Sequence, residues 1–536
     1  CIRDRINEFG GLDELLRRAD EIKQPKRRQT LIDNAEQIKL SRELVTLDCN
    51  TPLKFELEDL EFNAPVPKQL LDFLAKMEFR TLTKRISQKF DVEMPTSDIL
   101  DPNNKISYSE QIAFDNKKYE HIKTSEQLQI WINKIYEIGY VAVDTETTSL
   151  NDMLAELVGI SLALEIGSAC YIPIGHKEGQ NDDLFENSQL VKGQLDLEFV
   201  LARLRPILED DSILKIGQNI KYDAKVFSRY GVTLNTFDDT MLLSYALHGG
   251  LHNHGMDALS ERYLDHSPIA IKTLIGSGKS AITFDKVKIE DAVIYAAEDA
   301  DITLRLWKIF KQKLHLSRVT KVYETLERPL VPVLAQVEKN GIKVDRETLS
   351  RMSNAFAQKM AGLEAEIYEM AGESFNVGSP KQLGEIMFDK LGYEGGKKGK
   401  NGAYTTGADI LEDLATNYDF PKRVLDWRQL SKLKSTYTDA LQDHINPNTG
   451  RVHTSYISSG ASTGRLSSSD PNLQNIPIRS EEGRKIREAF ISKEGYKIVS
   501  LDYSQIELRI LAHMAEIDSL KKAFHEGQDI HAMTAS

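Results

Sequence analysis

Four acidic residues and one tyrosine form the set of side chains in this sequence that is best suited to phosphodiester chemistry. They are Asp144, Glu146, Asp223, Tyr295 and Asp299. Carboxylates supply the hard oxygen ligands that Mg²⁺ prefers, and two such ions about 4 Å apart can stabilise both the attacking and the leaving oxygen of a phosphoryl group. Mn²⁺ accepts the same ligands, whereas no His or Cys cluster suggests zinc. The set therefore predicts a two-metal nuclease site.

The local sequence predicts the elements that must position these groups. Residues 140–146 read as a strand, so Asp144 and Glu146, two positions apart, point to the same face of a sheet. Residues 215–223 read as a short strand that enters a helix near Asp223. Tyr295 and Asp299 lie one turn apart on a long helical run from residue 290 to about 314, so they share a helix face.

Each feature also has a simpler interpretation. An Asp-x-Glu pair after an apolar strand is more often a solvated strand end, and a tyrosine four residues before an aspartate is often a packing contact on a helix. The combination of all the features favours catalysis over either simpler interpretation.

The segments VDTET (143–147), NIKYD (219–223) and YAAED (295–299) resemble the proofreading 3′–5′ exonuclease domains of family A DNA polymerases. All five catalytic positions of that pattern are present. The resemblance implies an α/β domain of the ribonuclease H-like kind, with a mixed sheet flanked by helices. It also implies that single-stranded 3′ ends are the substrate and that Tyr295 orients the attacking water.

A second polar group lies nearer the end of the sequence. Residues 497–502 read as an apolar strand that ends at Asp502, and residues 504–513 follow at helical period. Upstream, residues 462–479 are rich in Ser, Asn, Gln and Arg, which donate to phosphates and to acceptors in the minor groove. Judged by composition alone, residues 462–479 would be interpreted simply as a polar loop.

Together these two stretches resemble the palm of family A DNA polymerases. The resemblance implies that Asp502 holds both polymerase metals, that the Tyr503 carbonyl is a further ligand, and that Glu507 excludes a ribose 2′-hydroxyl. It places Gln505 and His531 at nucleotide-binding positions. The implied activity is DNA-templated DNA synthesis with proofreading, in replication and repair, from deoxynucleoside triphosphates.

The same resemblance implies a set of contacts with primer–template DNA. Arg428 and Lys432 fall where the family contacts the duplex backbone. Arg465, Gln474 and Asn475 fall where it contacts the minor groove at the primer end. Acceptors in the minor groove are common to all correct base pairs, so such contacts report pairing geometry more than sequence.

The resemblance also divides the chain. Residues 1–62 are expected to be the C-terminal remnant of a 5′-nuclease domain, although an unrelated helical extension remains open. A linker over 63–112, the exonuclease domain over 113–315, and a partial polymerase domain over 316–536 follow, the last with a mainly helical thumb and a partial α+β palm. Because the fingers and the second palm aspartate of the family are not in this sequence, we expect no primer extension and no 5′-nuclease activity from the chain as given.

Composition is consistent with this division. A length of 536 residues suits several domains, and a formal net charge of −13 gives no overall nucleic-acid signature. Residues 421–490, however, carry eleven basic and seven acidic side chains. Three cysteines without pairing or metal spacing favour a reducing cytoplasm, and no apolar run approaches the roughly 20 residues of a membrane span. We expect a cytoplasmic monomer.

Two alternative functions remain open. A stand-alone nuclease of the ribonuclease D type shares the four carboxylates but would not carry segments 463–465 and 502–505. A noncatalytic primer–template binding module would bind DNA with salt sensitivity and leave it intact even with metal present.

Overall fold

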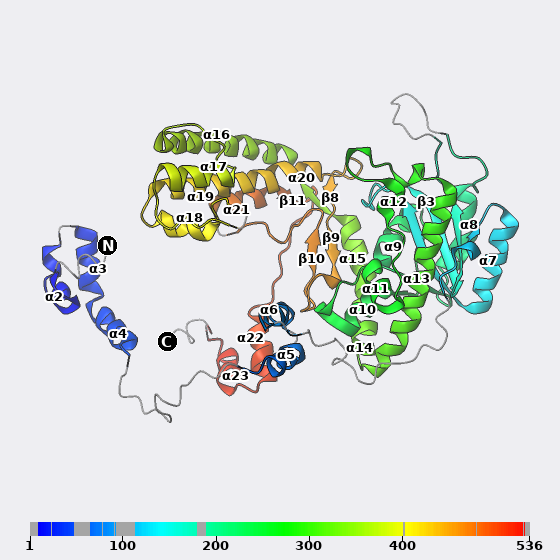
Figure 1. The fold of residues 1–536 in the computed structure, drawn as a ribbon, viewed down its shortest axis with the longest axis horizontal. Helices are drawn as coiled ribbons and strands as arrows, with labels where there is room; N and C mark the ends of the chain where they lie inside the picture. Colours follow the sequence, from blue (N-terminus) through cyan, green and yellow to red (C-terminus); the bar gives the residue numbers. More distant parts are fainter. Residues whose placement is uncertain are drawn as a thin grey trace. The chain divides into compact units, whose positions relative to one another are not determined.

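The computed structural model describes residues 9–22, 24–47, 65–77, 79–90, 92, 113–178, 189–399, 402–478, 480–528 and 530. The chain separates into two compact units, residues 1–110 and 111–536, each of which is treated by itself (Figure 1). His531, predicted at a nucleotide-binding position, lies outside the described residues. Among the helices that the structure describes, none combines the length and the apolar composition needed to span a bilayer.

The first unit is helical in its described residues. Its elements are α2 (Leu12–Arg17), η1 (Ala19–Glu21), α3 (Pro25–Asp33), α4 (Ala35–Val45), α5 (Pro67–Lys76) and α6 (Arg80–Phe90). Helices α5 and α6 lie within residues 63–112, for which the sequence predicts a linker. The linker prediction rests on polar residues beyond 92, which lie outside the described residues, whereas α5 has an amphipathic pattern and buries Leu71 and Leu74.

The second unit begins with a six-stranded mixed sheet, which confirms the predicted fold class. Strand order is β1-β4-β3-β2-β5-β6; β2 is antiparallel to β3 and parallel to β5. The strands are β1 (Glu120–His121), β2 (Tyr140–Thr147), β3 (Leu157–Glu165), β4 (Ser168–Pro173), β5 (Leu214–Gly217) and β6 (Phe237–Asp239).

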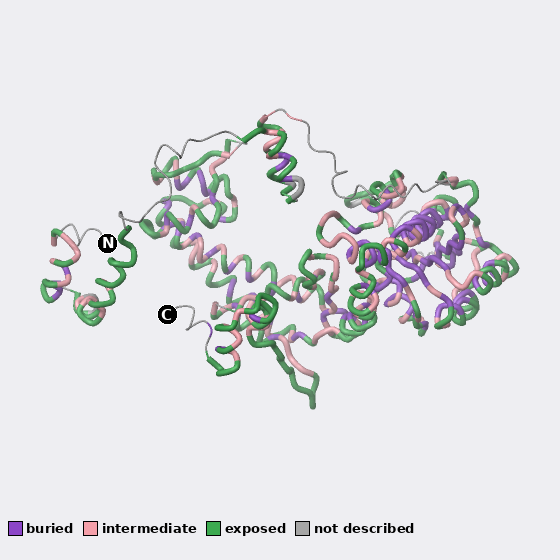
Figure 2. Tube along the Cα trace, turned by 90° about the horizontal axis from the view of Figure 1, so that it is seen from below, coloured by how far each residue is buried: buried purple, intermediate pink, exposed green. Residues whose placement is uncertain are grey.

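Helices cover this sheet, and the buried residues of the unit gather around it (Figure 2). A capping box between Thr124 and Gln127 starts the first helix, and Gly139 ends it in the left-handed conformation with φ 79°. The helices are α7 (Ser125–Ile138), α8 (Leu197–Leu208), α9 (Ile220–Arg229), α10 (Thr240–His248), α11 (Met256–Leu264), α12 (Ile271–Ile275) and α13 (Ile289–Leu316), with η5 (Gly249–Leu251), η6 (Gly278–Ser280) and η7 (Phe284–Lys286) between them.

The remainder of the unit is mainly helical, as predicted, with a break near residue 341. Its helical elements are α14 (Thr320–Val322), η8 (Tyr323–Glu327), α15 (Arg328–Asn340), α16 (Arg346–Ala371), α17 (Pro380–Gly384), η9 (Glu385–Lys390), α18 (Ala408–Ala415), α19 (Asp419–Leu433), η10 (Lys434–Asp439), α20 (Ala440–Asp443), η11 (Ser458–Gly460), α21 (Glu481–Glu488), α22 (Ile506–Met514) and α23 (Asp518–His525). Two small sheets accompany them, β11-β7-β8 and β10-β9, formed by β7 (Ile342–Val344), β8 (Arg451–Val452), β9 (Ser455–Ile457), β10 (Ser467–Ser469) and β11 (Phe490–Ile491).

The strand predicted over residues 497–502 is wrong. This stretch is irregular, and Val499 and Leu501 are 73% and 92% exposed. A strand forms only when its backbone groups pair with a neighbouring strand, and within the described residues no strand lies alongside this one. The helix predicted after it is confirmed as α22.

Candidate metal centre

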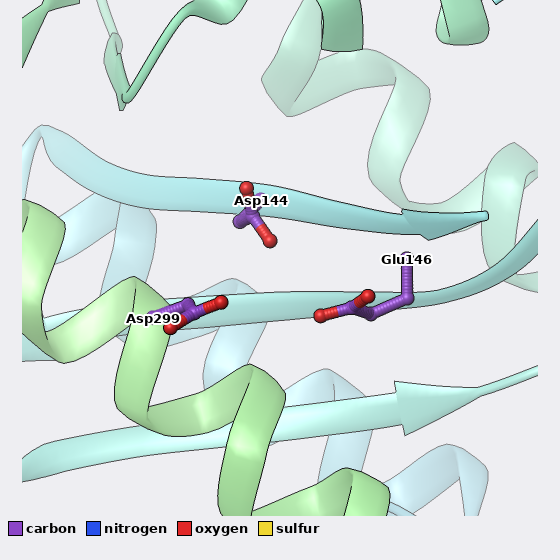
Figure 3. Close-up of side chains that lie close together, drawn as sticks. All are labelled: Asp144, Glu146 and Asp299. Atoms are coloured by element: carbon purple, nitrogen blue, oxygen red, sulfur yellow. The ribbon is translucent and has the colours of Figure 1, made fainter. Parts of the chain in front are cut away.

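Three of the predicted carboxylates come together in the structure. Asp144 and Glu146 project from β2 and Asp299 projects from α13, and one oxygen of each lies within 4.8 Å of the others (Figure 3). Glu146 and Asp299 are buried, and Asp144 is half-buried. The i, i+2 spacing on β2 predicts that Asp144 and Glu146 lie on one face of the sheet, as observed. Asp299, more than 150 residues later in the chain, completes the group.

Small side chains on α13 allow this helix to approach the sheet. Ala296, Ala297 and Ala300 are fully buried, and α13 packs on β2, β3 and β4. With only methyl groups at the contact, the helix backbone lies close to the strands, so the short side chain of Asp299 can reach the carboxylates of β2.

The fourth carboxylate, Asp223, lies beside this group but is not a member of it. Its Oδ1 accepts hydrogen bonds from the Thr145 backbone N–H, at 3.1 Å, and from the Thr145 hydroxyl, at 2.5 Å. Asp223 lies near the start of α9, where Asp239 accepts the N–H groups of Asn219 and Ile220 at 3.1 and 3.0 Å. A bond to the residue between Asp144 and Glu146 therefore fixes its position.

Burial and mutual repulsion make these carboxyls weak acids. Burial raises the pKa of Asp144 to about 7. Burial, followed by the charge of Asp144, raises the pKa of Glu146, Asp223 and Asp299 well above the usual range. Oδ1 of Asp299 is buried and has no hydrogen-bond partner among the described residues. The three clustered carboxylates, together with the unpaired Oδ1 of Asp299, are suitable ligands for a hard divalent cation such as Mg²⁺.

Tyr295 adds a neutral hydroxyl to the site. It lies one turn before Asp299 on α13, close enough for the Asp299 charge to act on its phenol. Burial, followed by the negative charge of Asp299, raises the pKa of this phenol. The hydroxyl therefore keeps its proton across the physiological pH range, and its oxygen remains available to orient a neighbouring polar molecule.

A cavity of about 710 Å³ opens onto this centre. The predicted residues line one side, and residues of the later segment, including His453, Ser455 and Asp470, line the other. The sequence analysis missed several further charged lining residues, among them Asp152, Lys221, Lys225 and Glu338. Lys221 and Lys225 each lie two residues from Asp223, so the sequence around Asp223 could have pointed to them. No motif in the sequence around Glu338 marks that residue.

Two of the predicted primer–template and nucleotide residues contact each other. The Arg465 guanidinium and the Glu507 carboxylate form an exposed ion pair at 2.9 Å. Gln474 donates from Nε2 to the Leu466 carbonyl at 3.0 Å, and the Asn475 carbonyl accepts from the Tyr437 hydroxyl. Helix α22 and the segment 461–475 are thereby linked.

The predicted metal-binding and nucleotide-binding residues near the start of α22 differ in exposure: Asp502 and Tyr503 are exposed, and Gln505 is half-buried. Asp502 and Tyr503 lie on the irregular stretch before α22, and Gln505 begins that helix with φ 52°. Among the described residues, Asp502 belongs to no group of three potential metal ligands. The structure thus does not gather a second metal centre around this position.

Arg428 and Lys432 line a separate groove of about 1020 Å³ on α19. Arg428 is half-buried and donates to the carbonyl and the hydroxyl of Thr406 at 2.5 and 3.2 Å. Lys432 is exposed in the same groove. Arg428 therefore holds the segment before α18, while Lys432 is the one of the two that remains open to solvent.

Three family models match the chain. "5′-3′ exonuclease, C-terminal SAM fold" matches residues 4–68, "3′-5′ exonuclease" matches residues 119–315, and "DNA polymerase family A" matches residues 346–536. The last two coincide with the parts that carry the metal centre and the predicted primer–template residues.

Relatives of known name cover almost the whole chain. A protein named DNA polymerase I from Rhizobium leguminosarum is 46% identical over 99% of this chain and 58% of its own length, and one from Pseudomonas aeruginosa is 41% identical over 94% and 54%. The chain thus spans a little over half the length of these relatives. The solved POL domain of Pol1 from M. smegmatis, in complex with DNA primer–template and dNTP, matches with a TM-score of 0.62 at 30% identity, over 78% of this chain and 66% of its own. The chain belongs to the family A DNA polymerases.

Proposed function

We propose that residues 113–315 form a 3′–5′ exonuclease that removes nucleotides from single-stranded 3′ ends of DNA. The observation that carries the proposal is the group of three carboxylates within 4.8 Å, with Tyr295 beside one of them in the same cavity. Two Mg²⁺ ions would be held by Asp144, Glu146, Asp223 and Asp299, and Mn²⁺ would satisfy the same oxygens.

In the proposed hydrolysis, the residues around the metal centre have different roles. When bound, the cations supply positive charge that offsets the charge developing on the attacking and leaving oxygens. Tyr295, which keeps its proton and lies beside Asp299, orients the attacking water. Asp223, anchored by Thr145, completes the ligand set. The cavity admits the 3′ end, and its walls exclude bulk water from the reacting phosphate.

The proposal is tested by incubating the chain with a 5′-labelled oligonucleotide, single-stranded or 3′-mismatched on a template, in Mg²⁺ or in EDTA. We expect a ladder of products shortened from the 3′ end in Mg²⁺ alone. An oligonucleotide of unchanged length in both conditions would favour the noncatalytic binding module. Preference for RNA over DNA would favour the ribonuclease D alternative.

Replacing Tyr295 with Phe is expected to lower kcat for this hydrolysis by about 10²-fold, because the water loses an orienting hydroxyl. The ring is kept, so the packing of α13 is not disturbed. The carboxylate ligands also remain, so the affinity for Mn²⁺, measured by electron paramagnetic resonance, should be unchanged. A large loss of Mn²⁺ affinity would show instead that the phenol acts by holding the metal site together.

We further propose that the later segment binds primer–template DNA through Arg465, Gln474 and Asn475. The supporting observation is that a hydroxyl from the nuclease part secures this loop. Tyr245 on α10 donates to the Ala461 carbonyl at 2.6 Å and accepts from the Gly464 N–H at 3.1 Å. Lys432 in its groove suits the duplex backbone, and Asp502, Tyr503, Gln505 and Glu507 would meet the deoxynucleoside triphosphate and its metals.

Replacing Tyr245 with Phe is therefore expected to weaken binding of duplex primer–template by about 2- to 10-fold, the range expected for the loss of hydrogen bonds that hold a loop in place. Fluorescence anisotropy at fixed salt measures this effect. Hydrolysis of a short single-stranded oligonucleotide should be unchanged, because Tyr245 does not line the cavity of the metal centre. Equal weakening on both substrates would contradict the assignment.

A further inference from the structure

Glu338 is a buried acidic residue that lies next to the metal centre yet outside both matched domains. It belongs to α15, within residues 316–345, between the segments matched as 3′–5′ exonuclease and as polymerase. The residue is 2% exposed and lines the cavity of the metal centre. A carboxylate buried to this degree is retained only when its charge is compensated.

The compensation comes from the helix that carries Asp223. Lys221 and Lys225 of α9 both donate to Glu338, the first to Oε1 and the second to Oε2. Oε1 also accepts the backbone N–H of Tyr456 at 2.7 Å, and Lys221 donates in addition to the Tyr456 carbonyl. Both carboxylate oxygens are thus occupied, and strand β9 is attached to the same group.

The charges within this cluster cancel. Lys225 has a second anionic partner, Asp152, at 2.5 Å. Two ammonium groups therefore face two carboxylates, Glu338 and Asp152. Removing the charge of Glu338 alone would leave one unbalanced cation in a buried place, which is far more costly than losing a surface ion pair.

The geometry makes α9 depend on this cluster. Lys221 and Lys225 are four residues apart, one turn of the helix, and Asp223 lies midway between them in the sequence. Both lysines form ion pairs with the Glu338 carboxylate, so the helical turn that carries Asp223 is bonded to Glu338 at each end. Helix α9 has ten residues and no side-chain cap from Asn219. Asp239 accepts the N–H groups at its start and Thr145 bonds Asp223 itself, so the Glu338 cluster acts alongside these contacts.

We propose that Glu338 is a positioning residue for the metal centre, acting through Lys221 and Lys225 to fix Asp223. The inference rests on the proposed exonuclease function. It means that the nuclease site is completed by a side chain from outside the matched exonuclease domain. A ligand displaced by a fraction of an ångström binds its cation poorly, and loss of such supporting residues commonly costs 10- to 100-fold in metal affinity or activity.

The test compares Glu338→Gln with Asp238→Asn in the full chain. Asp238 is a matched control: it is also buried, it also pairs with two cations, Lys311 and Arg328, and Arg328 belongs to α15. It does not contact α9 side chains in any described hydrogen bond or ion pair. Both substitutions should lower the melting temperature. Glu338→Gln leaves the buried Lys221 without its carboxylate, and Asp238→Asn removes a buried carboxylate from Lys311 and Arg328, which keep Glu324 as a partner.

The expected difference lies in metal binding. Glu338→Gln should weaken Mn²⁺ binding, measured by electron paramagnetic resonance, by about 10-fold or more, and should lower kcat while changing the KM for a single-stranded oligonucleotide less than about 2-fold. Asp238→Asn should leave Mn²⁺ affinity and kcat within about 2-fold of the wild type.

Each outcome decides the proposal. Equal Mn²⁺ affinity in the wild type and Glu338→Gln would overturn it and leave Glu338 a stabilising residue only. Equal losses in Glu338→Gln and Asp238→Asn would overturn it too, since the effect would then be general. If the wild type binds Mn²⁺ but hydrolyses no oligonucleotide, the exonuclease function fails, while the Mn²⁺ comparison still decides the role of Glu338.

Discussion

Replacing Asp299 with Asn is expected to abolish hydrolysis and, in the absence of metal, to make the protein more stable. The substitution removes one of the three carboxylates that lie within 4.8 Å of one another. Loss of a ligand to the catalytic cations should lower the rate by at least about 10³-fold, because charge stabilisation by metal contributes several kcal/mol.

The gain in stability has a separate cause. Burial and the charge of Asp144 both disfavour the ionised form of Asp299, whose Oδ1 has no partner among the described residues. A neutral amide of the same shape removes this repulsion and leaves the packing around the side chain unchanged. A gain of about 1 kcal/mol corresponds to about 2–4 °C in a domain of this size, so the melting temperature in EDTA at pH 8 should rise by at least about 2 °C.

Asp301 supplies the matched control on the same helix. It is fully buried but paired, accepting from Arg305 at 3.0 Å, from the Tyr119 hydroxyl at 3.0 Å and from the Gly167 N–H at 2.9 Å. Asp301→Asn should therefore lower the melting temperature, opposite in sign to Asp299→Asn. Two substitutions that shift the melting temperature in the same direction would contradict the view that the metal centre stores electrostatic repulsion.

The second large effect is a dependence of stability on pH that Mg²⁺ reverses. A carboxyl has a pKa near 4 in the unfolded chain, whereas that of Asp144 is raised to about 7 in the fold. Between these values the folded state binds more protons than the unfolded state, so its stability falls as pH rises and the full cost is present above pH 7. In EDTA the melting temperature should drop between pH 5 and pH 8.

Metal should cancel this drop. Mg²⁺ binds the ionised carboxylates of the folded state, so at pH 8 it should raise the melting temperature, whereas at pH 5 protons compete and the rise should be smaller. The measurement is a series of thermal scans at both pH values, in EDTA and in Mg²⁺. A Mg²⁺ effect that is as large at pH 5 as at pH 8 would contradict the assignment of the ligands.

Other buried groups titrate in the same window, so a control is needed. Burial lowers the pKa of His176 and of His248 to about 4, which makes the folded state less stable as pH falls below the unfolded value of about 6.5. These histidines act against the carboxylates. The double variant Asp144→Asn with Asp299→Asn retains both histidines, so its difference from the wild type isolates the two substituted carboxyls. Its drop above pH 5 should be smaller but not absent, because burial still raises the pKa of Glu146 and Asp223.

The sequence by itself determined the features that depend on local periodicity. The alternation over residues 140–146 places Asp144 and Glu146 on one face of β2, and helical spacing puts Tyr295 and Asp299 on one face of α13. The same periodicity identified the short strand β5 that leads into α9, and the helix α22. These features follow from backbone geometry, which repeats over a few residues regardless of what packs against it.

Local periodicity also misled at one place. Residues 497–502 have the composition of a strand, but a strand needs a second strand to satisfy its backbone groups, and none lies beside it among the described residues. The composition of residues 497–502 therefore shows that they could form a strand, but a strand forms only where the backbone pairs with a neighbouring strand.

Only the tertiary structure decided which of the acidic residues meet. The buried alanines of α13 bring Asp299 to β2, while the bond to Thr145 holds Asp223 to one side of the group. Glu338 had no local signal at all, because the lysines that neutralise it lie more than 100 residues earlier in the chain. Contacts between such distant positions depend on how whole elements pack, and no spacing within one element can encode them.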